Sequence, residues 1–585
     1  MSEKQSIPSI LKRLWMHISP RRKKQFALLF TLMVTASFTE GLSIGAVLPF
    51  LAILTNEDLI YKSELIKPLL GFLNIEPTDN VLFTLTVIFC LAACLSAAVR
   101  LLLMWASAKL SFNTGADLSI DIYRKTLYQT YAEHIAINSS EIINTITTKT
   151  HELTATLTNV LTILSSAVML VAITATLIYI KPVVAVAAFF SFGALYGLVI
   201  ISTRKRLHAN STRIAKNSTA VVKSLQEGLS GIRDVLIAGT QATYCEIYRK
   251  ADVPLKQAQA ENSFMAASPR YAMEGLGMVL IAILAYTLSR SSMGLATTIP
   301  TMGALAMGAQ RLLPLLQTMY SSSSNIVGVQ ASLGDALKLL ERSLPAYVLD
   351  QKAVIPMQFK EAISLKNVSF RYSQDTPLVL KGINLEIKKG SRVGFVGTTG
   401  SGKSTLADLV MALLQPTEGE LLIDGKPVSY IDPRSWQLHI AHVPQSIYLA
   451  DATIAENIAF GVPLGDIEMA KVIEAATLAQ IASTIDRMPL AYQTVVGERG
   501  VRLSGGQRQR IGIARALYRR ADVIIFDEAT SALDTETEQA VIAAIKSLSP
   551  DLTILTIAHR ESTVEDCSVV YRVESGVAAV VRTHA

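Results

Sequence analysis

Long hydrophobic runs occupy about the first 330 residues of the chain, and no run of that length follows them. Each is close to or above the roughly twenty residues that an α-helix needs to cross the hydrocarbon core of a bilayer. We place these runs at about residues 26–54, 81–99, 153–180, 183–202, 264–288 and 293–319. From residue 363 the pattern changes to short β-rich segments with turns, and then to alternating helix and strand. The pattern predicts a membrane all-α domain of six transmembrane helices followed by an α/β domain.

The composition agrees with a large part of the chain lying in lipid. Hydrophobic residues make up 50% of the chain, charged residues only 17%, and the mean hydropathy is +0.38. Soluble domains usually carry about 25% charged residues. The net charge of +7 would also suit a nucleic-acid-binding protein, but membrane proteins carry an excess of Lys and Arg on their cytoplasmic loops. We therefore expect a lipid bilayer as partner and no nucleic acid.

Basic residues also set the expected orientation. They cluster before the first hydrophobic run and in the loop at residues 204–233, so both segments are expected on the cytoplasmic side. Six spans then return the second half of the chain to the cytoplasm, where ATP is available. Glycines interrupt the second inner loop at residues 227–235, where we expect a short coupling helix or, alternatively, a plain surface turn.

A glycine-rich segment follows the apolar run at residues 392–396 and opens an apolar-periodic stretch at 406–414. It reads Gly397-Thr-Thr-Gly-Ser-Gly-Lys403-Ser404-Thr405, and strand, glycine-rich loop and helix in this order are the context of a phosphate-binding P-loop. Backbone N–H groups and the helix N-terminus surround the phosphates. Lys403 is expected to reach the β- and γ-phosphates, and the Ser404 hydroxyl to bind Mg²⁺. The nucleotide-binding candidates here are Gly397, Thr398, Thr399, Gly400, Ser401, Gly402, Lys403, Ser404 and Thr405.

Two further motifs stand about a hundred residues later. Leu503-Ser504-Gly505-Gly506-Gln507 precedes an apolar strand that ends in Asp527-Glu528. Together with the P-loop this combination is highly specific and predicts an ATP-driven machine. The second part of the chain is thus expected to be a cytoplasmic P-loop ATPase domain at residues 362–585, after a transmembrane domain at 1–334 and a linker at 335–361.

With these motifs, residues 360–585 resemble the nucleotide-binding domain of ABC transporters, and the whole chain resembles a type IV ABC exporter half-transporter. The resemblance implies ATP and Mg²⁺ as cofactors. It implies that Tyr372 stacks on adenine, that Gln445 contacts Mg²⁺ or water, and that His559 contacts the γ-phosphate. Asp527 ends an apolar strand, as a Mg²⁺-binding carboxylate should, and Glu528 is the candidate for polarising the attacking water.

The same resemblance implies a dimer. Ser504, Gly505, Gly506 and Gln507 would close on the ATP held by the opposite subunit, and Asp534 would lie at the same seam. Because every motif is intact, we expect two identical chains with two competent sites, rather than an asymmetric heterodimer.

Charged residues within the hydrophobic runs bear on the substrate. Arg100, Arg270 and Arg311 lie in or beside such runs, as do Glu40 and Glu274. A charge at the centre of a membrane helix costs about 2.5–3.5 kcal/mol on insertion scales. One interpretation is that Arg100 and Arg270 pair with the two glutamates or reach the interface. The other is a cationic cavity in which the three arginines bind a phosphate or pyrophosphate head group.

A narrower resemblance favours the second interpretation. Residues 38–51, 268–277 and Arg311-Leu-Leu-Pro314 are similar to segments of bacterial lipid-linked oligosaccharide flippases of the N-glycosylation pathway. An amphipathic segment at residues 57–73 is similar to their external helix. This implies an ATP-driven flippase, in the inner (plasma) membrane of a bacterium, for an anionic lipid-linked oligosaccharide or a related glycolipid or polysaccharide precursor. The alternatives are a multidrug or lipid A-type exporter and, in a different class, an ATP-gated channel or regulator.

Overall fold

The computed structural model describes residues 6–55, 81–180, 182–289, 295–345, 348, 354–428, 430, 432–528, 551–558 and 564–583. The chain divides into two compact units. The helical unit comprises Met1–Tyr128 and Ile137–Ser343, and the α/β unit comprises Gln129–Ala136 and Leu344–Ala585.

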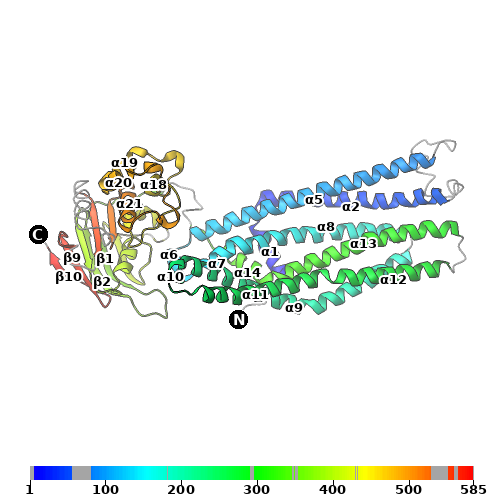
Figure 1. Ribbon diagram of the computed structural model, residues 1–585, viewed down its shortest axis with the longest axis horizontal. Helices are drawn as coiled ribbons and strands as arrows, with labels where there is room; N and C mark the ends of the chain where they lie inside the picture. Colours follow the sequence, from blue (N-terminus) through cyan, green and yellow to red (C-terminus); the bar gives the residue numbers. More distant parts are fainter. Residues whose placement is uncertain are drawn as a thin grey trace. The chain divides into compact units, whose positions relative to one another are not determined.

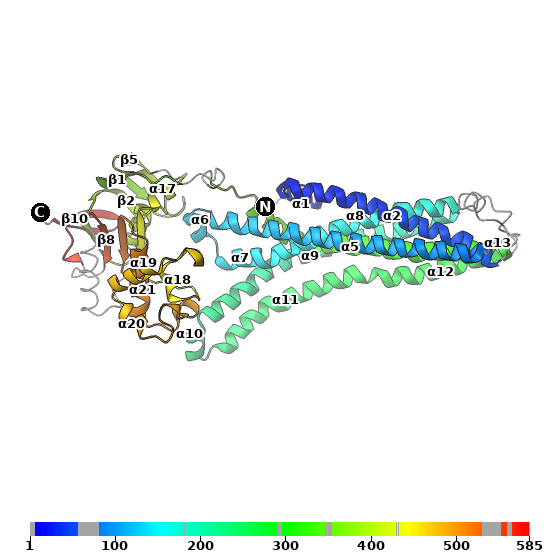
Figure 2. The same ribbon diagram turned by 90° about the horizontal axis from the view of Figure 1, so that it is seen from above.

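Long α-helices that lie side by side make up the helical unit (Figure 1, Figure 2). The expected hydrophobic runs fall mainly in α2 (Pro20–Thr55), α5 (Val81–Leu127), α8 (Thr150–Ile180), α9 (Pro182–Ser230), α12 (Pro269–Ser289) and α13 (Leu295–Gly328). The other elements are α1 (Ile7–His17), α7 (Ser139–Asn144), the π-helix η1 (Thr145–Lys149), α10 (Ile232–Ile237), α11 (Gln241–Ala267) and α14 (Gln330–Leu340). Within the segment at 227–235, α9 ends at Ser230 and the short helix α10 begins at Ile232, so a short helix is present there, and its coupling role stays a prediction. The external segment at 57–73 lies outside the described residues.

Three stretches of the described helices are long and apolar enough to cross a membrane: Pro20–Ser43, Thr86–Leu127 and Ser139–Ile178. Large apolar side chains on α5 point outward, with Leu91, Leu101 and Met104 exposed by 64%, 63% and 67%. Apolar surface of this extent is unfavourable in water. In lipid the same apolar side chains contact apolar chains, which is favourable. An α-helix also satisfies its backbone hydrogen bonds internally, as the membrane interior requires.

Helix α14 runs through the boundary that the sequence places at residue 334. Its buried face contributes Leu333, Leu337 and Leu340 to a cluster with Ile10 and Leu14 of α1. These residues recur at a spacing of three or four, so one stripe of the helix is apolar. Packing of this stripe within the helical unit explains why that unit continues to Ser343.

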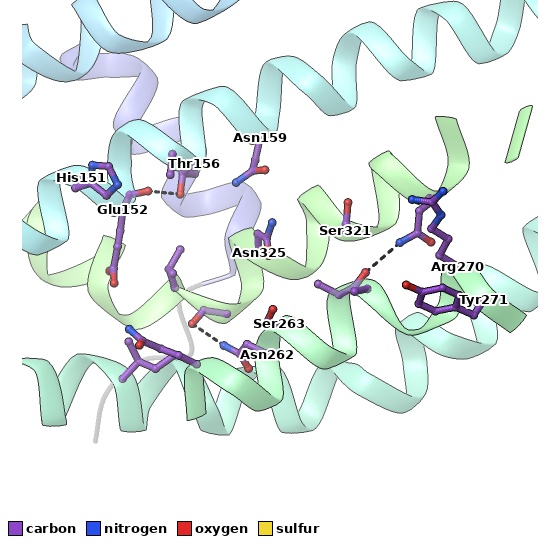
Figure 3. A pocket seen from close by; sticks show the side chains of 18 residues that line it. His151, Glu152, Thr156, Asn159, Asn262, Ser263, Arg270, Tyr271, Ser321 and Asn325 are labelled. Carbon is purple, nitrogen blue, oxygen red and sulfur yellow. Dashed lines mark hydrogen bonds between the residues drawn. The ribbon is translucent and has the colours of Figure 1, made fainter. Parts of the chain in front are cut away.

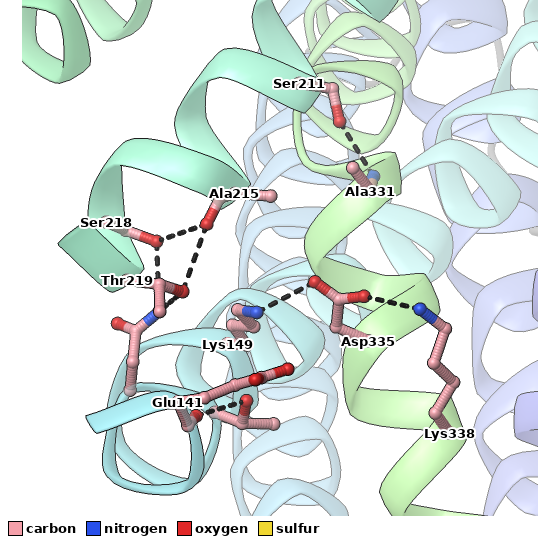
Figure 4. A network of polar contacts seen from close by, with 11 residues as sticks. Glu141, Lys149, Ser211, Ala215, Ser218, Thr219, Ala331, Asp335 and Lys338 are labelled. Carbon is pink, nitrogen blue, oxygen red and sulfur yellow. Dashed lines mark hydrogen bonds and ion pairs between the residues drawn. The ribbon is translucent and has the colours of Figure 1, made fainter. Parts of the chain in front are cut away.

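A polar network ties α14 to the base of α8 (Figure 4). Lys149, the last residue of the π-helix, is only 2% exposed, and its Nζ lies 2.8 Å from Oδ2 of Asp335. The other carboxylate oxygen of Asp335 accepts a hydrogen bond of 3.0 Å from Lys338. Burial opposes ionisation of Asp335, but the hydrogen bonds from Lys149 and Lys338 outweigh it and lower the pKa of Asp335.

The α/β unit contains two sheets. An antiparallel sheet has the strand order β2-β1-β4-β5, from β1 (Ala362–Phe370), β2 (Leu380–Lys388), β4 (Glu418–Ile423) and β5 (Lys426–Pro427). The second sheet has the order β10-β9-β3-β8-β7-β6. Its strands are β3 (Arg392–Val396), β6 (Ile440–Val443), β7 (Val523–Asp527), β8 (Thr553–Ala558), β9 (Val569–Glu574) and β10 (Val577–Thr583). Strands β9, β3, β8, β7 and β6 are parallel, and only β10 runs antiparallel to its neighbour.

Helix α16 (Lys403–Val410) packs in the main core of this unit together with both sheets. Phe395, Leu406, Val410 and Trp436 are almost completely buried there. A second core lies around α21 (Gly505–Tyr518). The remaining helices are α6 (Tyr131–Ala136), α17 (Arg434–Gln437), α18 (Ile454–Ile458), α19 (Met469–Leu478) and α20 (Ala482–Asp486), with 3-10 turns η2 (Leu464–Asp466), η3 (Ala491–Gln493) and η4 (Glu498–Gly500).

Candidate functional site

The sheet order brings most of the sequence motifs to one edge. Parallel strands β3, β8, β7 and β6 are neighbours in the sheet, so their carboxyl ends lie along the same edge. The P-loop follows β3, Asp527 and Glu528 end and follow β7, and Gln445 comes two residues after β6. This edge is where open α/β sheets bind their ligands.

Glycines shape the phosphate-binding loop. A Cβ atom at Gly397 would lie only 2.2 Å from the carbonyl oxygen of Val573. Gly402 has φ +104°, a conformation that L side chains rarely adopt, and a Cβ there would lie 2.8 Å from Leu380. The chain can therefore turn from β3 into α16 only with glycine at these positions, and the N–H groups at the start of α16 remain available for an anion.

Lys403 is held within the loop. Its Nζ donates hydrogen bonds of 2.9 Å and 3.0 Å to the carbonyl oxygens of Gly397 and Thr398. Burial lowers the pKa of Lys403, and the carboxylates of Glu528 and Asp527 oppose this shift. A phosphate placed in the loop would offer the ammonium group oxygen acceptors that carry charge, which form stronger hydrogen bonds than neutral carbonyls do.

Glu528 and Gln445 are in contact across the edge. The Gln445 side-chain amide donates a hydrogen bond of 2.7 Å to Oε2 of Glu528. Glu528 has φ +50°, a left-handed conformation that is uncommon for a residue with a side chain. Its backbone N–H donates to the carbonyl of Ile557 in β8. The candidate base is thus fixed by its neighbours on both sides, because the backbone is bonded to β8 and the carboxylate to Gln445.

The residues fit Mg²⁺ bound together with a nucleotide. Among the described residues no group of three or more His, Cys, Asp or Glu side chains could hold a metal alone. Mg²⁺ in nucleotide sites is held by one or two protein oxygens, the phosphates and water, so such a group is not required. Ser404 in the first turn of α16 and Asp527 at the end of β7 provide oxygen ligands of this kind.

Tyr372 lies close to the P-loop helix. Its hydroxyl is 3.0 Å from Oγ1 of Thr405, and its ring meets Phe370 edge-on with 5.0 Å between centroids. The side chain is half exposed. This agrees with a ring available for stacking.

Ser504, Gly505, Gly506 and Gln507 form the N-terminus of α21. The Ser504 side chain accepts from the Gln507 N–H, and the Gln507 side chain accepts from the Ser504 N–H at 2.9 Å. This capping box fixes the helix start and places two glycines in its first turn, where no side chain covers the backbone. His559, Asp534 and the side chain of Arg311 lie outside the described residues.

Comparison with known proteins shows the family. Residues 7–309, just over half of the chain, match the ABC transporter transmembrane region, and residues 380–531 match the ABC transporter family. The chain is an ABC transporter. One transmembrane region and one ATPase domain in a single chain are the arrangement of an exporter half-transporter, so this protein is an ATP hydrolase of the membrane.

Two curated relatives and one solved structure illustrate the relationship. An ATP-dependent lipid A-core flippase of Chromohalobacter salexigens is 32% identical over 76% of this chain and 76% of its own length. The heterocyst differentiation ATP-binding protein HepA of Nostoc sp. is 32% identical over 75% of this chain and 71% of its own. A bacterial Atm1-family ABC exporter with ATP bound has the same fold, with a TM-score of 0.77 at 23% identity, over 96% of this chain and 94% of that one.

Two of the three arginines proposed to bind substrate, Arg100 and Arg270, form ion pairs. Nη1 of Arg100 lies 3.4 Å from Oε1 of Glu40, which is almost completely buried. Nε of Arg270 lies 2.7 Å from Oε1 of Glu274, four residues along the same helix. The structure therefore shows the ion pairs that the sequence left as an alternative. Arg270 keeps both Nη groups outside that pair, because only its Nε contacts Glu274.

Arg270 also lines a cavity of about 670 Å³ in the helical unit (Figure 3). The walls come from α8, α9, α11, α12 and α13, and α9 contributes Ile214. Sequence reasoning singled out the arginine but missed the polar residues around it. A signal was present, since Asn, Gln and Ser recur at the inner ends of the fifth and sixth hydrophobic runs, where a lipid-facing helix would be apolar.

Sequence reasoning also missed helix α6 as part of the α/β unit. Residues Gln129–Ala136 cluster with that unit although they lie within the first inner loop. Burial raises the pKa of Tyr131, and the negative charge of Asp408 adds to the rise. The sequence did contain a signal for this helix in Thr130, a residue type that often caps helix starts. Its side chain and carbonyl accept hydrogen bonds from the first turn of α6, which begins a new helix after the long helix α5 has ended.

Proposed function

We propose that two copies of this chain form a homodimer that uses ATP to move an amphipathic, anionic lipid-linked saccharide from the inner to the outer leaflet of a bacterial plasma membrane. The observation that carries this proposal is a polar cavity within a membrane-spanning helical unit, with Arg270 in its wall. An exporter of apolar compounds would need apolar and aromatic walls, whereas Tyr271 is the aromatic residue that lines this cavity.

The nucleotide cycle follows from the residues at the sheet edge. Lys403 and the loop amides bind the phosphates of ATP, and Tyr372 stacks on the adenine. Ser404, Asp527 and Gln445 would hold Mg²⁺, which would supply positive charge beside the phosphates. Glu528 would orient and polarise the attacking water, and the family resemblance implies that His559 would contact the γ-phosphate. Phosphoryl transfer needs positioned charge rather than covalent help from the protein, so these roles suffice.

The N-terminus of α21 supports the proposed dimer. The first-turn backbone of Gly505 and Gly506 suits the phosphates of a nucleotide bound by the second chain, and the family resemblance implies that Asp534 would lie at the same seam. One chain provides one P-loop and one such helix start, and two identical chains complete two sites. ATP binding would draw the two α/β units together, and hydrolysis would release them.

The substrate class is supported by chemistry that two kinds of lipid share. A polyprenyl-pyrophosphate oligosaccharide and a lipid A-core molecule both combine acyl or prenyl chains, phosphate and sugars. The name of the Chromohalobacter relative favours the second kind, and the resemblance of residues 38–51 and 268–277 to lipid-linked oligosaccharide flippases favours the first. Arg270 would contact the phosphate in either case, with Arg100 and Arg311 as further candidates.

The test is flipping in proteoliposomes by the native chain and by Glu528→Gln. Fluorescent polyprenyl-pyrophosphate oligosaccharide and labelled lipid A-core are compared in parallel vesicles. ATP-dependent flipping of one lipid, lost in the variant, supports the proposal and identifies the lipid. Active ATPase without flipping of either lipid contradicts the substrate class. Ion current without stoichiometric hydrolysis would instead indicate a gated channel.

A further inference from the structure

The cavity of Figure 3 is rich in side chains that hydrogen-bond without carrying charge. Five of the residues that line it are amides, contributed by three different helices: Asn159, Gln259, Asn262, Gln317 and Asn325. Hydroxyl side chains, including Ser263 and Ser321, lie among them. Its volume of about 670 Å³ falls within the range of roughly 300–1,000 Å³ that is typical of ligand pockets.

Two of the five amides are engaged by the protein itself. Gln317 donates to the carbonyl of Ala266 at 3.1 Å and accepts from the Tyr196 hydroxyl at 2.9 Å. Asn262 accepts from Asn210 at 3.1 Å and donates to the Gly328 carbonyl at 3.4 Å. These contacts hold α9, α11 and α13 together, so these two amides have a structural use.

The other three amides are not used in this way. Asn159, Gln259 and Asn325 make no side-chain hydrogen bond to the described part of the chain, yet all three line the cavity. Each offers two N–H donors and a carbonyl acceptor. A ligand that matches them must present many donors and acceptors close together, which is the chemistry of the hydroxyl groups on a sugar ring.

The charges of the cavity are few and lie apart. In Figure 3, Arg270 lies with Tyr271 at one end and Glu152 with His151 at the other, while Asn159, Asn325 and Ser321 lie between them. Among the lining residues Arg270 is the one permanent cation, and part of its charge is already balanced by Glu274. A highly anionic ligand would find one cation only. An apolar ligand would displace the water that bonds these solvent-accessible amides and would offer no hydrogen bonds in its place.

We propose that this cavity binds the uncharged saccharide part of the transported lipid, with Asn159, Gln259 and Asn325 hydrogen-bonded to ring hydroxyls. The inference rests on the proposed function. It also sets the orientation of the bound head group, because the phosphate would contact Arg270 and the sugars would extend toward Glu152. Tyr271, which is 74% exposed, provides a flat surface beside the first sugar.

The experiment separates sugar recognition from phosphate recognition. Full-length native protein and the variant Asn159→Leu/Asn325→Leu are reconstituted in proteoliposomes, and ATP-dependent flipping is measured for two probes. One is a polyprenyl-pyrophosphate oligosaccharide, and the other is the same lipid with a single sugar. Leucine is similar in size to asparagine but has no hydrogen-bonding group. Basal ATPase activity and size-exclusion profile report correct folding.

We expect the variant to flip the oligosaccharide lipid about tenfold less efficiently, since each neutral hydrogen bond contributes a factor of roughly 2 to 10. Flipping of the single-sugar lipid should change much less, and Arg270→Ala should impair both probes equally. Gln259→Leu should act in the same direction as the double variant. Gln257→Leu is its matched control, because Gln257 is exposed on the same helix and does not line the cavity.

Two results would overturn the inference while leaving the proposed function intact. One is an equal reduction in flipping of the two probes by the double variant. The other is a ratio of oligosaccharide-lipid flipping to single-sugar-lipid flipping that stays native in both the double variant and Gln259→Leu. If the native protein flips neither probe, the proposed function itself fails and this inference fails with it. The two failures are therefore distinguishable in one set of vesicles.

Discussion

Substituting Lys149 and substituting Asp335, the two partners of one ion pair, should reduce stability by different amounts. Lys149 is 2% exposed and its ammonium group contacts Asp335 at 2.8 Å. Asp335 is 31% exposed and has a second partner in Lys338. Asp335→Ala leaves a cation buried without its counter-charge, whereas Lys149→Met leaves a carboxylate that still has Lys338 and some water.

The magnitudes follow from this difference. Removing one partner of a buried ion pair costs about 3–5 kcal/mol. We take the lower end, about 3 kcal/mol, for Asp335→Ala, because the carboxylate side of the pair is partly solvated. At roughly 1.5 °C per kcal/mol for a unit of about 330 residues, this lowers Tm by about 4–5 °C. Lys149→Met should cost about 1 kcal/mol or less, because methionine keeps the length and apolar stem of lysine and fills the same volume.

The assay is thermal unfolding of the full-length transporter in nanodiscs, followed by intrinsic fluorescence. A double variant, Lys149→Met/Asp335→Ala, completes the cycle. The sign of the lysine substitution should reverse: it lowers Tm slightly in the native background and raises it in the Asp335→Ala background. Equal losses for the two single variants, or no gain in the double variant, would refute the assignment of a buried cation to Lys149.

The remaining predictions concern the α/β unit. Burial raises the pKa of Asp408 from 3.8 to about 6, and the charge of Asp527 adds to the rise. The folded state thus favours the protonated acid, so the stability that this group contributes is complete below pH 3.8 and is lost as the pH rises through 6. Asp408→Asn should raise Tm at pH 7.5 and have little effect at pH 4, and a gain independent of pH would contradict this. Glu528→Gln should reduce phosphate release by roughly 10²-fold or more while fluorescent ATP still binds, and substantial residual hydrolysis would exclude Glu528 as the catalytic base.

Much of the nucleotide site could be predicted from the sequence, because its geometry is local. The run from residue 392 to residue 414 contains strand, loop and helix in order, and glycine at positions 397 and 402 is required by the backbone itself. Asp527 at the end of an apolar strand is equally local. The sheet order then places these segments together, since parallel strands end at one edge.

Contacts between distant residues could not be predicted in the same way. The bond from Gln445 to Glu528 joins residues 83 apart, and that from Lys149 to Asp335 joins residues 186 apart. Helical spacing alone accounts for Arg270 with Glu274, which are four residues apart on one helix. The partner of Arg100 depended on how α2 packs against α5, which hydropathy does not specify.

The two candidate sites differ in what a ligand must displace. In the nucleotide site Lys403 is bonded to loop carbonyls and Glu528 to Gln445, so ATP and Mg²⁺ exchange existing bonds for stronger ones. The net affinity for ATP is therefore the difference between the new bonds and the internal bonds that they replace. After loss of the γ-phosphate the internal bonds can form again, which favours product release. In the membrane cavity Asn159, Gln259 and Asn325 have no such partners among the described residues, so the proposed sugar hydroxyls would displace only water there. If the cavity binds the saccharide as proposed, recognition depends on hydrogen bonds that these amides do not make within the described chain. Removing the amides should then affect the choice of substrate before it affects the ATPase.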